Sequence, residues 1–115
     1  MSMLLNSFLF GGVEYTLSAG TAKIFESSGA VWTSITMMDS THAIVAYQDY
    51  GNSNYGTACC LSLSGTTITA GTAVVFESAN TNYTSVTRMD STHAIVTYED
   101  SGNSDYGTAC CLTLT

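Results

Sequence analysis

Short runs rich in Val, Ile, Thr and Tyr alternate along the chain with turn-forming Gly, Ser, Asn and Asp, and no apolar stripe of helical spacing persists. This pattern predicts β-strands joined by turns. In the first half of the chain we expect strands at residues 32–38, 42–48, 55–63 and 66–76. The run at 42–48 is apolar on both of its faces, which is typical of a strand buried between two layers.

The second half of the chain repeats the first with an offset of 51 residues, so that His93 corresponds to His42. The match includes identical blocks, such as residues 38–45 and 89–96. A period near 50 residues of strand-rich sequence is typical of β-propeller blades, which contain ~40–50 residues in four strands. We therefore expect two tandem blades.

The repeats are shifted relative to the ends of the chain. Residues 13–25 correspond to the last strand of the repeat, and Thr115 stands where the fourth strand of the second repeat would begin. We therefore expect one domain, 1–115. It would hold an N-terminal strand at 13–25 that completes a neighbour's blade, a first blade at 32–76 and a second blade at 83–115 lacking its fourth strand.

The predicted fold class is all-β, with two four-stranded antiparallel propeller blades per chain that close into a β-propeller by homo-oligomerisation. Two blades cannot close on themselves, and a head-to-tail contact between copies generates a ring when the rotation closes. Propellers contain ~4–8 blades, so two blades per chain allow a dimer, a trimer or a tetramer.

Each repeat carries the motifs Asp-Ser-Thr-His, Asp-x-Gly-Asn-Ser and Tyr-Gly-Thr-Ala. In these features the chain resembles bacterial propeller-like repeat arrays, and in its two-blade architecture it resembles small propeller lectins of bacteria and fungi whose chains trimerise to six blades. The resemblance implies a head-to-tail homo-oligomer, with a trimer favoured and a tetramer as the alternative. No lectin family's sugar-contacting residues match position by position, so none is carried over.

The charge pattern excludes several partners. Charged residues make up 10% of the chain and hydrophobic residues 45%, which favours a surface covered by a second copy. The net charge is -7 with Lys23 and Arg88 as the basic residues, so we expect neither nucleic-acid binding nor attraction to an anionic membrane. The apolar start lacks a basic residue, is interrupted at Asn6 and is too short to span a bilayer, so we expect no signal peptide and no membrane insertion.

Cysteine occurs as two adjacent pairs, Cys59-Cys60 and Cys110-Cys111. Neighbours in a strand point to opposite faces, so a pair cannot chelate one metal ion in the usual way. Disulfides between stacked blades are disfavoured because sheets lie ~10 Å apart, whereas a bridge needs Cα atoms within ~7 Å. We expect four buried, reduced thiols, no metal and no cofactor, and reduced thiols favour the cytoplasm without fixing the compartment.

The two histidines each follow an Asp-Ser-Thr turn. A structural role, with His42 and His93 bonded to these turns, is favoured over a metal ligand or a pH switch. Asp39, Ser40 and His42 share one turn, and we expect their side chains to splay apart. A catalytic triad needs side chains that converge, so this motif predicts no catalysis.

The glycine-rich loops that follow Asp49 and Asp100 gather oxygen ligands over six residues. They lack the regular spacing and terminal Glu of a calcium loop. Turn formation is therefore favoured over calcium binding, with Gly51 and Gly56 expected to supply positive φ angles.

In a propeller, the loop between the second and third strands shares a face with the connection from the fourth strand to the next blade. That face would combine aromatic rings with Asn, Asp and Glu, which suit the ring faces and hydroxyl groups of sugars. The candidate ligand-binding residues are Trp32, Tyr83, Tyr50, Asn52, Asn54, Asn103, Asp105, Glu26 and Glu77. The alternative is that the aromatic rings pack between blades and the acidic groups stay solvated.

These features favour a non-enzymatic, self-assembling β-propeller binding module with lectin-like carbohydrate binding. The alternative is a structural or assembly protein, or a duplicated propeller fragment, with no small-molecule ligand. A glycosidase would need Glu26 and Glu77 within ~5–10 Å of each other. Equivalent residues repeated around a ring fit repeated binding sites better than one asymmetric active site.

Overall fold

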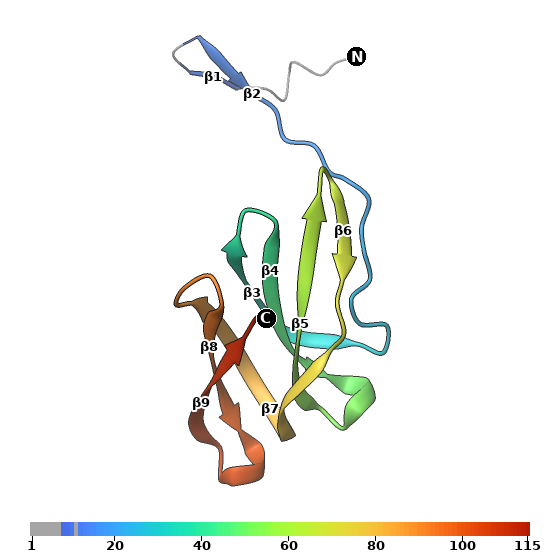
Figure 1. Cartoon of the computed structure of the whole chain (residues 1–115). Helices are drawn as coiled ribbons and strands as arrows, with labels where there is room; N and C mark the ends of the chain where they lie inside the picture. The colour runs from blue at the N-terminus through green and yellow to red at the C-terminus, as the bar shows by residue number, and fades with distance from the viewer. Residues whose placement is uncertain (1–7, 11) are drawn as a thin grey trace.

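The computed structural model describes residues 8–10 and 12–115, which form antiparallel β-strands with two short 3-10 turns (Figure 1). The predicted all-β, antiparallel fold is therefore confirmed. A small hairpin comes first, made of β1 (Phe8–Phe10) and β2 (Val13–Tyr15). The other seven strands form one open sheet with β9 at an edge, and within the described residues this sheet does not close into a barrel or a ring.

The first unit of this sheet contains three full strands, β3 (Ala30–Asp39), β4 (His42–Asp49) and β5 (Tyr55–Ser64). Two further segments pair with β5, namely β6 (Thr67–Ala70) and the first half of β7 (Val74–Arg88). The strand predicted at 66–76 is therefore interrupted. At the interruption, the Gly71 N–H donates to the Cys60 carbonyl at 2.8 Å.

The second unit begins inside β7, which is 15 residues long and links the two units. Its first half pairs with β5 up to Asn80, and its second half pairs with β8 (His93–Asp100) from Thr81 onward. β8 pairs in turn with β9 (Tyr106–Thr113). The strand predicted at 32–38 has its equivalent at 83–89 in the second repeat, and there it forms part of the second half of a longer strand.

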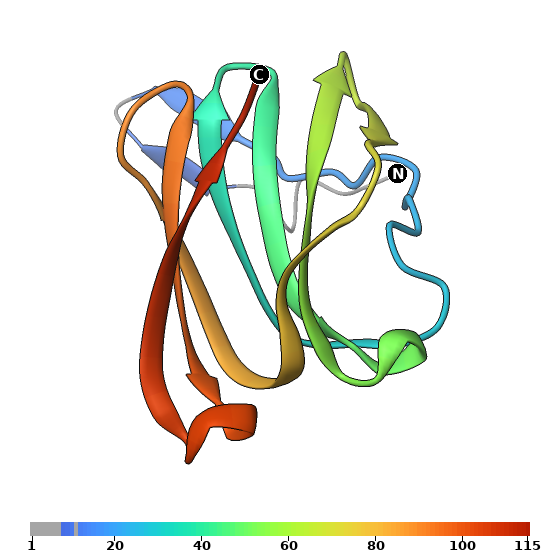
Figure 2. The same cartoon turned by 60° about the horizontal axis from the view of Figure 1, so that its bottom comes forward.

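The two units pack against each other and stand side by side in Figure 2. Met38, Ile44, Ala46 and Ala58 of the first unit form one core with Val86, Ala94, Val96 and Tyr98 of the second. The strands β3 and β7 are also joined by hydrogen bonds, because the Ser34 hydroxyl accepts from the Val86 N–H at 3.1 Å. The Arg88 guanidinium donates to the Met38 carbonyl at 2.9 Å.

The opposite face of the first unit is covered by the segment that precedes β3. Val45, Tyr47 and Cys59 are buried there, with Phe25 packed against them. β4 is therefore buried on both faces, as its sequence predicts. β8 has nearly the same sequence but is buried on one face only, because its other face, with Thr97, is open.

The segment predicted as an N-terminal strand at 13–25 forms no continuous strand in the described structure, because Val13–Tyr15 pairs with β1 and residues 16–29 form no regular strand. Its pairing with a neighbouring copy stays a prediction. One local prediction is wrong. The positive φ angles of the glycine-rich loops belong to Ser53, Asn54, Ser104 and Asp105 and not to Gly51 or Gly56. Each loop instead begins with a 3-10 turn, at Tyr50–Asn52 in the first unit and at Ser101–Asn103 in the second. The two residues that follow each turn adopt the left-handed conformation.

Candidate functional site

The rings of Trp32 and Tyr83, two of the predicted site residues, lie together at the ends of the two units. Their centroids are 4.4 Å apart, with the planes inclined at 54°. Trp32 is 44% exposed and Tyr83 is 60% exposed, so both rings are open to a ligand. An exposed, tilted aromatic pair offers a flat apolar surface of the kind that sugar rings bind.

Both aromatic residues have a left-handed backbone, with φ of 54° at Trp32 and 55° at Tyr83. For a bulky side chain this conformation costs about 1–3 kcal/mol and persists only where the surroundings hold it. Each residue lies at a break in strand register, between Val31 and Ser34 in β3 and between Asn82 and Ser85 in β7. The strain is thus repeated at equivalent positions, and strain of this kind concentrates at functional sites.

Packing between β3 and β7 holds this pair in place. The Thr84 hydroxyl, next to Tyr83, donates a hydrogen bond to the Trp32 carbonyl. It is also 3.5 Å from the Ala46 carbonyl. Thr84 is 8% exposed, so these contacts lie inside the interface between units and fix the aromatic residue of one unit relative to the other.

An open cavity of about 540 Å³ lies beside Tyr83 on the second unit. Its lining includes Glu99 and Asp105, and Asp105 is another of the predicted site residues. The floor is the open face of β8 and β9, with Thr97 and Ala109. On the first unit the equivalents of Thr97, Glu99 and Ala109 are Ala46, Gln48 and Ala58, which are buried on the face that packs against the second unit. The cavity is therefore the uncovered counterpart of the surface that joins the units.

Each glycine-rich loop turns its first aspartate inward. Asp49 and Asp100 are each 7% exposed, and each side chain accepts a hydrogen bond at 3.0 Å from the glycine two positions later. Both carboxylates are thus engaged in turn formation, as predicted. Within the described residues, no cluster of three or more His, Cys, Asp or Glu side chains is arranged to hold a metal ion.

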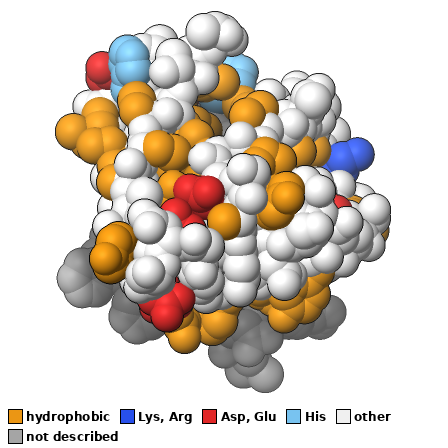
Figure 3. Space-filling model, turned by 90° about the horizontal axis from the view of Figure 1, so that it is seen from below, with side chains coloured by type: hydrophobic (Ala, Val, Ile, Leu, Met, Phe, Trp, Pro, Cys, Tyr) orange, Lys and Arg blue, Asp and Glu red, His pale blue; other side chains and the backbone are white. Residues whose placement is uncertain are grey.

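The remaining predicted loop residues are not all brought into one site with the aromatic pair. Tyr50 is 57% exposed, and its ring lies against Gly29. The Asn54 carbonyl accepts from the Thr81 N–H at 3.0 Å, so Asn54 ties its loop to β7. Asn52 and Asn103 lie in the exposed 3-10 turns, outside the lining of the cavity. Figure 3 shows the molecule from below, where carboxylates stand among hydrophobic and uncharged polar surface.

Glu26 and Glu77 serve as acceptors for buried tyrosines. The Tyr98 hydroxyl donates to Glu77 at 3.0 Å, and the Tyr47 hydroxyl lies 3.4 Å from Glu26. Burial, and also the neighbouring negative charges, raise the pKa of both phenols, which keeps them protonated as donors. Hydrogen bonds from the Ser28 hydroxyl and N–H lower the pKa of Glu26, so it is an ionised acceptor. Each carboxylate thus has its own tyrosine partner, which is Tyr47 of the first unit for Glu26 and Tyr98 of the second unit for Glu77.

The histidine turns differ from the expectation that their side chains splay apart. His42 Nδ1 lies 2.9 Å from an Asp39 carboxylate oxygen, and His93 Nδ1 lies 2.9 Å from Asp90. The prediction that each histidine bonds its turn is confirmed. The hydrogen bond from the Thr92 N–H and then the bond to His93 lower the pKa of Asp90 to about 2. These contacts stabilise an exposed hairpin turn.

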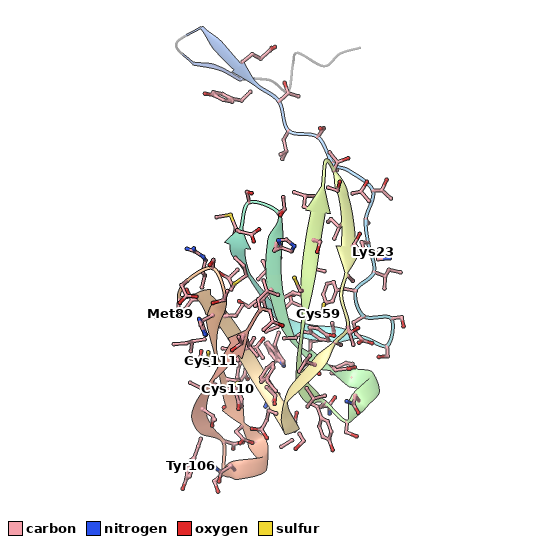
Figure 4. All side chains as sticks on the ribbon, viewed as in Figure 1. Lys23, Cys59, Met89, Tyr106, Cys110 and Cys111 are labelled. Atoms are coloured by element: carbon pink, nitrogen blue, oxygen red, sulfur yellow. The ribbon has the colours of Figure 1, made fainter. Side chains whose placement is uncertain are left out.

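All four cysteines are free thiols, but they are not equally buried. Cys59 is buried and Cys111 is exposed, so the prediction of four buried thiols is wrong for Cys111. Figure 4 shows Cys110 and Cys111 on β9 of the second unit and Cys59 on β5 of the first. Burial raises the pKa of Cys59, Cys60 and Cys110, which lowers the reactivity of their thiols.

A buried amide network between the units was not found from the sequence. Gln48 is 4% exposed, and its side-chain amide lies 2.9 Å from Asn80 Oδ1 and 2.8 Å from Asn82 Oδ1. It also donates to the Thr81 carbonyl at 2.6 Å. Asn82 donates in turn to Glu99 at 3.0 Å, so polar contacts run from the first unit through β7 to the open face of the second.

The repeat comparison holds a signal for this network. Asn80 and Asn82 stand where the first repeat has Gly29 and Val31, and Gln48 stands where the second repeat has Glu99. The two repeats are otherwise closely similar. Differences between them that gather at one contact indicate that the contact depends on these particular side chains.

No protein-family model, no curated protein and no solved structure matches this chain. In the described part of the chain, no helix has the length and apolar character needed to cross a lipid bilayer. The structure itself defines the class: an all-β tandem-repeat protein whose two antiparallel units pack face to face.

Proposed function

We propose that this chain is a non-enzymatic, self-assembling β-propeller module that binds carbohydrate at the rim formed by Trp32 and Tyr83. The observation that carries the proposal is the exposed aromatic pair, held in a strained backbone at equivalent positions of both units. Backbone strain held at equivalent, exposed positions is typical of functional sites.

Self-assembly is supported by the way the units pack. The second unit covers the face of β4 and β5 that carries Ala46 and Ala58, both nearly inaccessible. The equivalent face of β8 and β9, with Thr97 and Ala109, is open. Addition of further blades would cover it, and a closed ring would repeat the aromatic rim. Repeated weak sites on one face increase overall affinity through effective concentration.

The test of carbohydrate binding is a glycan array with the fluorescently labelled chain, run with and without calcium. Binding to a defined group of glycans, lost in the Trp32→Ala variant and retained in Tyr15→Ala, supports the proposal. Tyr15 is a suitable control because it is 67% exposed and lies in the separate N-terminal hairpin. Silence across all glycans under both conditions would remove carbohydrate binding.

Assembly is tested separately by native mass spectrometry. A ring of two-blade chains predicts one dominant oligomer, with a trimer favoured, and a stable monomer of 12.1 kDa would contradict self-assembly. The structural alternative, an assembly protein without a small-molecule ligand, is favoured by the extensive packing between units. This alternative predicts that the oligomer forms and that the chain binds no glycan on the array.

A further inference from the structure

The segment that precedes β3 packs on the first unit as the start of β7 packs on the second. The Phe25 and Tyr47 ring centroids are 5.3 Å apart, and the Phe76 and Tyr98 centroids are 5.2 Å apart. In both cases the tyrosine hydroxyl is directed to the glutamate that follows the phenylalanine. The residues around Phe25 therefore hold the position of the last strand of a blade that would precede the first unit.

The last strand of the first unit shows what such a strand pairs with. Val75 of β7 lies opposite Thr57 of β5, and Thr69 of β6 lies opposite Ser62 of β5. All these pairs are antiparallel. In the second unit, the strand that repeats β5 is β9.

The corresponding residues near the N-terminus lack this pairing in the described structure. Residues 17–24 belong to no strand, and Ile24, which repeats Val75, is 73% exposed. β9 lies at the edge of the sheet, with β8 as its strand neighbour. Within the described residues, a segment with the sequence of a last strand thus lies outside the sheet, and β9 has a strand neighbour on one side only.

The chain's own β9 is on the wrong side to receive the segment. Figures 1 and 2 both show residues 16–28 beside β6 at one side of the molecule and β9 at the other, with the first unit between them. In Figure 4 the labelled Lys23 lies on the side opposite Tyr106 and Cys111 of β9. Pairing within one chain would require the segment to leave Tyr47 and cross the first unit.

We infer that the partner of β9 is the segment 16–27 of a second copy of this chain, paired antiparallel, and this rests on the proposed self-assembly. The repeat sets the register: Ile24 of one copy lies opposite Thr108 of the other, and Ser18 lies opposite Thr113. The open face of β8 and β9 then packs on the first unit of the copy that supplies the strand, over Tyr47.

The burial pattern supports this occupant. Cys111 is exposed, whereas Cys60, its equivalent in the first unit, is partly buried. Thr97 is exposed, whereas its equivalent Ala46 is fully buried. The open face of β8 and β9 has nearly the same sequence as the face of β4 and β5 that packs against the second unit. It should therefore pack against the equivalent surface of another copy, which is the geometry of head-to-tail assembly.

A disulfide between two singly substituted chains tests the register. Ser18→Cys is made in one chain and Thr113→Cys in another, both in a Cys60→Ser, Cys111→Ser background to remove the more accessible native thiols. Both positions are exposed, so the substitutions leave the core intact. Directly opposed residues have Cα atoms ~4.5–5.5 Å apart, within reach of a disulfide.

After mixing and mild oxidation, we expect a covalent heterodimer on a non-reducing gel that is absent from either variant alone. The matched control is Leu17→Cys with Thr113→Cys, whose side chains would point to opposite faces of the pair and should not cross-link. An oligomer in native mass spectrometry without the Ser18–Thr113 cross-link would overturn the register and leave self-assembly standing. A monomer under all conditions would overturn both.

Discussion

The ring centroids of Trp32 and Tyr83 lie 4.4 Å apart although the residues are 51 positions apart in sequence, because they occupy equivalent register breaks in β3 and β7 and these strands pack side by side. Aromatic contacts of this kind contribute about 0.5–1.5 kcal/mol beyond their buried area. The pair is exposed, so its rings are available to a ligand as well as to each other.

Tyr83→Ala should therefore weaken binding of any glycan found on the array by about 3- to 10-fold, because one half of the aromatic surface is lost. Isothermal titration calorimetry measures the change. Tyr15→Ala is the control, since Tyr15 is 67% exposed and lies in the separate N-terminal hairpin. Equal losses in the two variants would show that the aromatic pair is not the binding surface.

Gln48→Leu should lower the free energy of unfolding by about 1–3 kcal/mol, because the Thr81 carbonyl and two asparagine side chains lose their buried donor. Gln48→Glu should cost more, since it adds a negative charge in front of three acceptors. Urea unfolding followed by circular dichroism, at one fixed protein concentration, measures both. A variant as stable as the parent would show that the network contributes no stability.

Glu99 of the second unit is the equivalent of Gln48 in the first, so Glu99→Gln gives the second unit the glutamine of the first. In a head-to-tail contact, Glu99 of one copy would face Ala30 of the next, where Gln48 faces Thr81 within the chain. A carboxylate cannot donate to the Ala30 carbonyl, whereas a glutamine can. We expect Glu99→Gln to tighten association about 3- to 10-fold in analytical ultracentrifugation. Weaker association would contradict the proposed contact.

Asp90 should titrate far below an ordinary aspartate. Its folded pKa of about 2 lies under the reference value of 3.8, so the stability it contributes is present above pH 3.8 and is lost as the pH falls toward 2. His93→Ala should raise the Asp90 pKa part of the way, because the larger contribution of the Thr92 N–H remains. NMR titration of the side-chain carboxyl carbon measures both values. An unchanged pKa in the variant would exclude the histidine contact.

The sequence predicts the fold where local pattern decides the structure. The apolar run at β4 predicts burial on both faces, and the Asp-Ser-Thr turns predict the hairpins. β8 has almost the same residues as β4 and is half open, because burial depends on what lies beside a strand and not on the strand alone. The segment 16–29 carries the repeat sequence of a strand, yet without a neighbouring edge it forms none.

The site is predicted less completely, for a physical reason. Trp32 and Tyr83 were expected on one face, but their left-handed backbone arises from breaks in register that no propensity encodes. The Gln48 network was missed because its partners, Asn80 and Asn82, converge from another strand. Such contacts become visible in a sequence only through the positions at which two close repeats differ.

Thiol reactivity gives the last prediction, because the four cysteines occupy different surfaces. Cys111 is exposed on the face of β9 that a second copy would cover, whereas Cys59 is buried within the first unit. In dilute protein, below the association midpoint, Cys111 should react first with a chromogenic disulfide reagent. At concentrations where the oligomer forms, its reaction should slow to the rate of Cys60, its equivalent inside the chain.

Cys111→Ser identifies the fast phase, since that phase should disappear from the variant at low concentration. The three other thiols should stay slow at every concentration, because burial raises their pKa and reduces the thiolate fraction. After denaturation without reductant, the parent chain should release four thiols per chain, and fewer would reveal disulfides. A Cys111 rate that does not change while the oligomer forms would place the contact between copies elsewhere than on the open face of β8 and β9.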